Sequence, residues 1–206
     1  MEGDADERLQ FARSLRNFIG MTEIVFVDET SFWLFVNHLP GWFHKDQKNP
    51  LSVERHSGKV HMCGGISCFG KVFVTTFRNN LNSNRYSRIM RRDLIPNANR
   101  LYVYGWWLAQ DKGPSHQGDA LVVKYKEVPY YLDWPARSPD FNPIENLWGE
   151  IKQNVRKRLP QTLEQLEQLA LEEWDNIPNE KIKNYCESFE NRLKEVIRHK
   201  GEKIDY

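Results

Sequence analysis

The sequence predicts an α/β fold, in which helices cover a central mixed sheet. Continuous apolar runs that are too short for helices indicate buried strands, and amphipathic segments of helical period follow them. The predicted order is an antiparallel meander, then alternating helix and strand, then helices only. That order favours a helix-covered sheet over an all-β or all-α fold, and no internal repeat is evident.

Length and composition fit one domain, residues 1–206. The 206 residues, 40% of them hydrophobic and 13% aromatic, suffice for one sizeable core. A formal net charge of +1 neither requires nor excludes a nucleic-acid partner. The three cysteines form no disulfide framework, and no signal peptide or membrane-length apolar run occurs. We therefore expect a soluble protein of a reducing compartment with no membrane partner.

The first half of the chain predicts one helix followed mainly by strands. Residues 6–19 form an amphipathic lead-in helix that Gly20 ends. Residues 24–27 are expected to be a central strand with Asp28 at its end, because four apolar residues in a row fit burial on both faces. Further strands are predicted at 32–36, after a short turn, and at 60–69 and 72–77.

The second half alternates helix and strand before ending in helices. Helices are predicted at 84–94, near 115–125, at 143–158, near 162–176 and at 178–200, and strands at 101–109 and 128–132. The 101–109 strand ends at Gln110 and Asp111, so Asp111 repeats the placement of Asp28.

His61, Cys63 and Cys68 have a spacing that a zinc site could use. Their neighbours are Gly64, Gly65 and apolar residues, so a buried strand pair is the preferred interpretation.

A loop with prolines at 135, 139 and 143 leads into the helix that starts near Pro143. Each proline fixes φ and restricts the residue before it, so the loop is stiff. Asn142 is predicted to be the N-cap, and Glu145 follows it in the first turn. Two interpretations stay open for Glu145: a capping-box partner of the helix start, or a functional carboxylate.

Asp28, Asp111 and Glu145 are predicted to converge at one edge of the sheet. Three carboxylates placed together fit divalent cations such as Mg²⁺, and two such ions can act together in phosphoryl transfer. Glu29 is expected to point to the opposite face of its strand, and Glu150 away around the helix. The remaining acidic candidates, predicted to be surface or capping groups, are Asp119, Asp133 and Asp140.

Basic side chains follow Glu145 on the same helix face. Gly149, Lys152 and Arg156 lie at i+4, i+7 and i+11, where Lys152 and Arg156 would meet a phosphate backbone. An ordinary solvated face is the alternative. A second basic cluster either follows a DNA backbone or faces water, and contains Arg85, Arg88, Arg91 and Arg92.

Three segments resemble the catalytic domain of mariner-type transposases, the Tc-one/mariner group of DDE transposases. They are VDETSF at 27–32, QDKGPSH at 110–116 and WPARSPDFNPIENLW at 134–148. The tail at 192–201 is similar to that family's closing segment as well. The resemblance covers nearly the whole chain and implies an RNase H-like fold.

The resemblance implies that Asp28, Asp111 and Glu145 bind two Mg²⁺ or Mn²⁺ ions. It implies DNA cleavage at transposon ends and joining of the freed 3′-hydroxyl to target DNA, with His116 and Asn142 as supporting residues. Transposon-end and target DNA are thus the expected partners, with a second copy of the chain in a homodimer. Residence in the nucleus is expected from the DNA substrate, not from a targeting signal.

The chain departs from the family pattern in three respects. Residues 112–144, between Asp111 and Glu145, number one fewer than is usual, and Lys112 and Gly113 replace other residue types. The family's tandem helix-turn-helix region has no counterpart in this sequence, so recognition of inverted repeats is not expected from this chain alone. Two alternatives therefore stay open: a nucleic-acid-binding remnant without activity, and another RNase H-like nuclease.

Overall fold

A central sheet organises the computed structural model, which describes residues 2–18, 20–34 and 58–205. The strands are β1 Ile24–Trp33, β2 Lys59–Ser67, β3 Gly70–Phe77, β4 Trp107–Ala109 and β5 Tyr130–Tyr131. They lie in the order β3-β2-β1-β4-β5. β1, β2 and β3 are antiparallel neighbours, whereas β4 runs parallel to β1 and β5 parallel to β4. The predicted mixed α/β sheet is confirmed.

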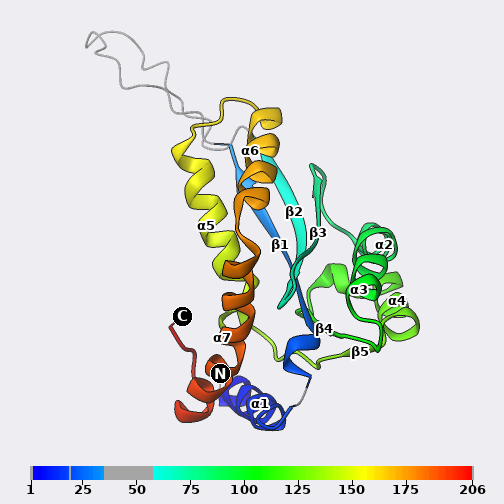
Figure 1. Ribbon diagram of the computed structural model, residues 1–206, viewed down its shortest axis with the longest axis vertical. Helices are drawn as coiled ribbons and strands as arrows, with labels where there is room; N and C mark the ends of the chain where they lie inside the picture. The colour runs from blue at the N-terminus through cyan, green and yellow to red at the C-terminus, as the bar shows by residue number, and fades with distance from the viewer. Residues whose placement is uncertain (1, 19, 35–57, 206) are drawn as a thin grey trace.

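Helices cover both faces of this sheet. They are α1 Glu2–Ser14, α2 Ser83–Ile89, α3 Ile95–Leu101, α4 Asp119–Glu127, α5 Ile144–Lys157, α6 Leu163–Asn176 and α7 Asn179–Arg198. In Figure 1, α5, α6 and α7 lie on one side of the sheet and α2, α3 and α4 on the other, while α1 packs against α7. No helix in the described part of the chain is long and apolar enough to cross a membrane.

The alternation of side chains along β1 divides the interior into two cores. Ile24 and Phe26 belong to the core under α5, α6 and α7. Val25 and Val27 belong to the core under α2, α3 and α4. The predicted burial of residues 24–27 on both faces is therefore confirmed. Because side chains alternate along a strand, the later even-numbered residues of β1 face α5, α6 and α7, and the odd-numbered ones face α2, α3 and α4.

Asp28 does not end its strand, contrary to the prediction. β1 continues to Trp33 because its polar residues still pair with β2, from Asp28 opposite Gly64 to Trp33 opposite Lys59. The predicted turn after Asp28 and the separate strand at 32–36 are therefore wrong, and residues 35 and 36 lie outside the described residues. Asp28 instead occupies the middle of the longest strand.

Several other helix and strand ends differ from the predicted ones for local reasons. Leu101 ends α3, and Gly105 has a positive φ of 108°, so only Trp107–Ala109 remain of the strand predicted at 101–109. A π-helical turn, Met90–Leu94, joins α2 to α3 and lengthens the helix predicted at 84–94. The predicted β2–β3 strand pair, with His61 and Cys63 inside β2, is confirmed, as are the last three helices to within two residues.

Candidate active site

Asp28 is held on the α5 side of the sheet. Its half-buried carboxylate accepts a 3.2 Å hydrogen bond at Oδ2 from the indole Nε1 of Trp148. Gly64 lies opposite Asp28 in β2, and a Cβ there would stand 2.9 Å from the rings of both Trp148 and Trp174. The glycine thus leaves the space in which Trp148 reaches Asp28.

Asp111 lies beside Asp28 because of the parallel register of β1 and β4. Phe26 pairs with Ala109, and each aspartate stands two residues further along its chain. The Asp111 carboxylate is 58% exposed, lies 2.9 Å from Nδ1 of His116, and accepts a 3.0 Å hydrogen bond from the Gly113 N–H. The hydrogen bond from His116 is the main cause that holds the pKa of Asp111 below its ordinary value.

Glu145 lies in the first turn of α5 and is not required for its cap. The predicted N-cap, Asn142, is wrong by one residue: Pro143 precedes the first helical residue, and the Asn142 side-chain oxygen accepts only a weak 3.4 Å bond from the Ile144 N–H. The N–H of Asn142, which a capping box would use, donates instead to the Pro139 carbonyl at 2.8 Å. The capping-box interpretation of Glu145 is therefore wrong, and its carboxylate is available for another role.

The three carboxylates share one electrostatic environment. Burial, and then the negative charge of Glu145, raise the pKa of Asp28 well above its ordinary value, and Asp111 adds to the shift. Burial also raises the pKa of Glu145, which Lys152 opposes and Asp111 reinforces. A divalent cation would relieve this repulsion. Within residues 2–18, 20–34 and 58–205, however, no three His, Cys, Asp or Glu side chains are grouped closely enough to hold a metal ion as they stand.

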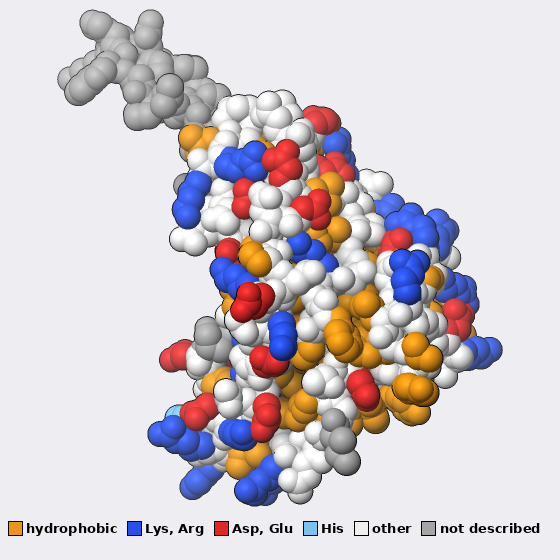
Figure 2. Space-filling model, in the orientation of Figure 1, with side chains coloured by type: hydrophobic (Ala, Val, Ile, Leu, Met, Phe, Trp, Pro, Cys, Tyr) orange, Lys and Arg blue, Asp and Glu red, His pale blue; other side chains and the backbone are white. Residues whose placement is uncertain are grey.

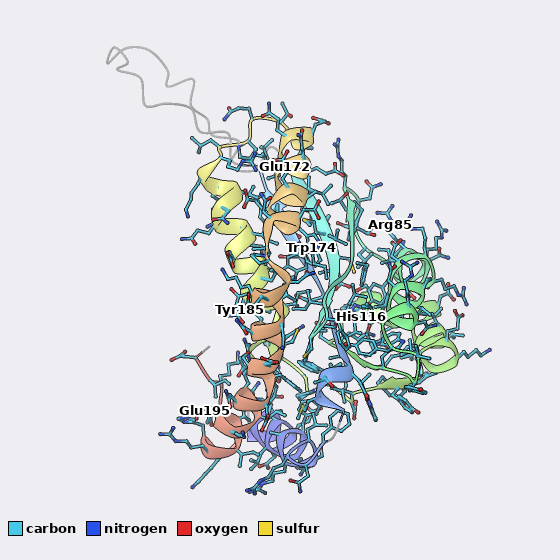
Figure 3. All side chains as sticks on the ribbon, in the orientation of Figure 1. Arg85, His116, Glu172, Trp174, Tyr185 and Glu195 are labelled. Atoms are coloured by element: carbon cyan, nitrogen blue, oxygen red, sulfur yellow. The ribbon has the colours of Figure 1, made fainter. Side chains whose placement is uncertain are left out.

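His116 and Glu29 form a contact that sequence reasoning missed. Glu29 points to the face opposite Asp28, as predicted, and there its Oε1 lies 3.0 Å from Nε2 of His116. Burial would lower the pKa of His116, but its hydrogen bonds to Asp111 and Glu29 outweigh burial and raise the pKa to about 10. Figure 3 shows His116 on the α2–α4 side of the sheet. In the sequence, only the alternation of side chains along the strand indicated that Glu29 lies on this face.

The basic residues of α5 line one groove. Gly149, Lys152 and Arg156 share it with Gln153 and Lys157, and the charge of Lys152 reaches Glu145. The opposite face of α5 is buried, as predicted, by Ile144, Leu147, Trp148, Ile151 and Val155.

The arginine cluster of α2 and the following turn lies across the sheet from α5, on the outer surface where Figure 2 shows blue side chains gathered. Arg88 is exposed. Arg91 pairs with Glu127 at 2.6 Å, and Arg92 with Asp93 at 2.8 Å. These arginines therefore do not line the α5 groove, and a DNA contact from Arg88 and Arg92 stays a prediction.

One acidic residue differs from its prediction. Asp119 and Asp133 are exposed, as expected, and Asp133 pairs with Lys112 at 2.9 Å, which draws that lysine away from Asp111. Asp140 is buried rather than at the surface, because Arg8 binds both of its carboxylate oxygens, at 2.7 and 2.5 Å. This pair fixes the proline loop that precedes Glu145.

Comparison with known proteins agrees with this geometry. The family model described as DDE superfamily endonuclease matches residues 23–167. The chain belongs to this family. It is 31% identical over 213 residues to the Tc3 transposase of Caenorhabditis elegans, covering 98% of the chain and 64% of the relative's length. It is also 28% identical over 188 residues to the Tcb2 transposase of Caenorhabditis briggsae, covering 86% of the chain and 68% of that relative.

Solved structures agree on the fold. The catalytic domain of Mos1 mariner transposase superposes with a TM-score of 0.80 at 15% identity, covering 100% of this chain and 97% of the other. A pre-cleavage Mos1 transpososome gives a TM-score of 0.81 at 14% identity, covering 100% of this chain and 65% of that one. The described sheet and helices therefore have the RNase H-like fold of the Mos1 catalytic domain.

Proposed function

We propose that this chain cleaves DNA phosphodiester bonds at transposon ends and joins the freed 3′-hydroxyl to target DNA. The observation that carries the proposal is the position of Asp28 on β1 and of Asp111 two residues beyond the end of the adjacent parallel strand β4, with the charges of Asp111 and Glu145 both acting on Asp28. Membership of the DDE endonuclease family supports the same chemistry.

Mg²⁺ or Mn²⁺ is the cofactor that we propose from the chemistry of these donors. Asp28, Asp111 and Glu145 would supply carboxylate oxygens, the ligands these hard cations prefer. Bound ions would activate the attacking oxygen and stabilise the leaving one. Mos1 paired-end complexes have been solved with Mn and with Mg, which supports the assignment by analogy.

The α5 groove is the proposed path of the DNA backbone. Lys152 and Arg156 would meet phosphates there, and Gly149 has no atom within 4 Å of an added Cβ, so the helix surface is open beside Glu145. We propose that Arg88 and Arg92 contact a more distant part of the DNA. Mos1 forms a paired-end complex with a transposon end, and by analogy a second copy of this chain belongs to the proposal. Action in the nucleus is proposed because the proposed substrate is DNA.

A nicking assay tests the proposal. Supercoiled and transposon-end DNA are incubated with Mg²⁺ or Mn²⁺ and the wild type, Asp28→Asn or Glu145→Gln. Glu150→Gln is the matched control, because Glu150 lies on the same helix but bonds to Lys181 and Tyr185. We expect metal-dependent nicks from the wild type and the control, and a loss of at least about 100-fold in the two site variants.

Other outcomes assign other functions. A wild type that binds DNA but is as inert as its variants would be a nucleic-acid-binding remnant. Preferential cleavage of RNA–DNA hybrids would identify another RNase H-like nuclease.

A further inference from the structure

We infer that Glu29 is a positioning residue that acts through His116 to hold the Asp111 carboxylate at the active site. The inference rests on the proposed function, because it concerns how one proposed metal ligand is oriented. Glu29 itself faces away from Asp28, on the other side of β1, so it is not proposed as a ligand.

The imidazole of His116 joins two segments that are far apart in sequence. Its Nε2 lies 3.0 Å from Oε1 of Glu29, in the middle of β1. Its Nδ1 lies 2.9 Å from Oδ1 of Asp111 and 2.8 Å from the Asp111 backbone carbonyl. Both ring nitrogens are thus engaged, and the ring can neither flip nor rotate without breaking one of these contacts.

Asp111 needs such an anchor because the sheet does not fix it. β4 ends at Ala109, so Asp111 lies beyond the last paired residue, with a side chain that is 58% exposed. A free aspartate at such a position would sample several rotamers, and ordering it on metal binding would cost entropy. The contact with His116 removes that freedom before a metal binds.

Glu29 in turn fixes His116. The imidazole is only 3% exposed and packs against the Tyr86 ring, with 4.3 Å between centroids. Glu29 is the acceptor at Nε2, and without it a polar ring nitrogen would be buried with no partner. The thiol of Cys63 donates to the same Glu29 oxygen at 3.8 Å, which keeps the carboxylate on this side of the sheet.

The loop is held from a second direction as well. The hydroxyl of Tyr86 donates a 2.6 Å hydrogen bond to Oε1 of Gln110, the residue before Asp111. The backbone near Asp111 is therefore fixed by α2, while its carboxylate is oriented by His116, which Glu29 holds, together with the Gly113 N–H. Because the backbone and the carboxylate are held by different residues, substitutions at Glu29 should change metal affinity more than they change the stability of the fold.

Calorimetric titration of the metal-free protein with Mn²⁺, without DNA, tests the inference. The variants are Glu29→Leu, which removes the acceptor, and Glu29→Gln, which keeps an acceptor oxygen. Glu150→Leu is the control, because the Glu150 side chain is 25% exposed against 20% for Glu29 and lies elsewhere. We expect Mn²⁺ affinity to fall about tenfold or more in Glu29→Leu, to fall less in Glu29→Gln and to stay unchanged in the control.

Nicking rates measured against Mn²⁺ concentration supply a second readout. A positioning role raises the half-saturating Mn²⁺ concentration of Glu29→Leu and leaves the rate at saturating metal within a few-fold of the wild type. A general structural defect would instead lower that rate at every concentration. Thermal unfolding in the absence of metal shows which variants are folded.

The outcomes separate this inference from the proposed function. Wild-type affinity in Glu29→Leu, together with lost binding in Asp28→Asn, would overturn the role of Glu29 alone. Absence of Mn²⁺ binding by the wild type, or unchanged binding in Asp28→Asn, would overturn the proposed function and this inference with it. If Glu29→Leu does not fold, Glu29→Gln decides: weakened binding supports the inference, and wild-type binding overturns it.

Discussion

The indole of Trp148 donates a hydrogen bond to the carboxylate of Asp28, with 3.2 Å between Nε1 and Oδ2. Trp148 lies on α5 three residues after Glu145, so one helix supplies both a carboxylate of the site and the group that orients another. Because the Trp148 ring is fully buried, its packing sets how α5 lies over β1. The position of Glu145 relative to Asp28 is therefore a property of the core.

Gly64→Ala is expected to destabilise the protein. Its new Cβ would stand 2.9 Å from the rings of Trp148 and Trp174, which are too tightly packed to move freely. Overpacking of this kind costs about 1–3 kcal/mol of unfolding free energy, measurable by urea denaturation. Gly149→Ala is the contrasting variant: no atom lies within 4 Å of its Cβ, so the helix should gain about 0.5–1 kcal/mol. Equal stability of Gly64→Ala and the wild type would contradict the packing argument.

Asp28→Asn should stabilise the metal-free protein at neutral pH. Burial and the neighbouring carboxylates raise the pKa of Asp28 in the folded state above its unfolded value of about 3.9. The Asp28 carboxyl group therefore contributes most to the free energy of unfolding below the unfolded pKa, where it is protonated in both states. This contribution is lost as the pH rises through the folded pKa. Asparagine avoids this loss, with a gain on the order of 1 kcal/mol.

The check for Asp28→Asn is a series of urea denaturations of the metal-free variant and wild type between pH 4 and 8. The difference in unfolding free energy should be small at pH 4 and should grow with pH. A difference that does not change with pH would count against the buried charge. Added Mn²⁺ should stabilise the wild type only.

Breaking the ion pair between Arg8 and Asp140 should be strongly destabilising. Both side chains are nearly inaccessible, at 3% and 5% exposure, and Arg8 also donates to the Gly201 carbonyl at 2.8 Å. Arg8→Leu leaves the Asp140 charge buried, which costs about 3–5 kcal/mol in thermal or urea unfolding. The control is Arg137→Ala, whose exposed pair with Asp4 should contribute less than about 1 kcal/mol. Similar losses in both variants would refute the distinction.

The sequence predicts the elements that depend on neighbouring residues better than those that depend on residues far apart in the chain. Helices at the end of the chain were predicted to within two residues because caps and apolar spacing are local. β1 was predicted to end at Asp28 because its polar second half resembles a turn. Only its pairing with β2, whose paired residues lie 26 to 36 positions further along the chain, keeps Asp28–Trp33 extended.

The same limit applies to the site. Asp28, Asp111 and Glu145 were predicted from strand ends, a helix start and a family resemblance, each of them a local pattern. The contact between Glu29 and His116 joins residues 87 positions apart, and that between Arg8 and Asp140 joins residues 132 apart. No periodicity connects such pairs, so burial of Asp140 and the anchoring of Asp111 emerge only from the packed structure.

Lys152→Gln should weaken DNA binding without affecting the fold. Lys152 lines the α5 groove and its charge reaches Glu145, so it stands where a phosphate would approach the carboxylates. Loss of one phosphate contact should make the plot of log affinity against log salt concentration less steep by about 1. Binding should weaken equally for all DNA sequences. Fluorescence anisotropy with a labelled duplex at several salt concentrations measures this. Lys194→Gln is the control, because that lysine pairs with Glu190 on α7, and an equal change in both variants would show that the groove has no special role.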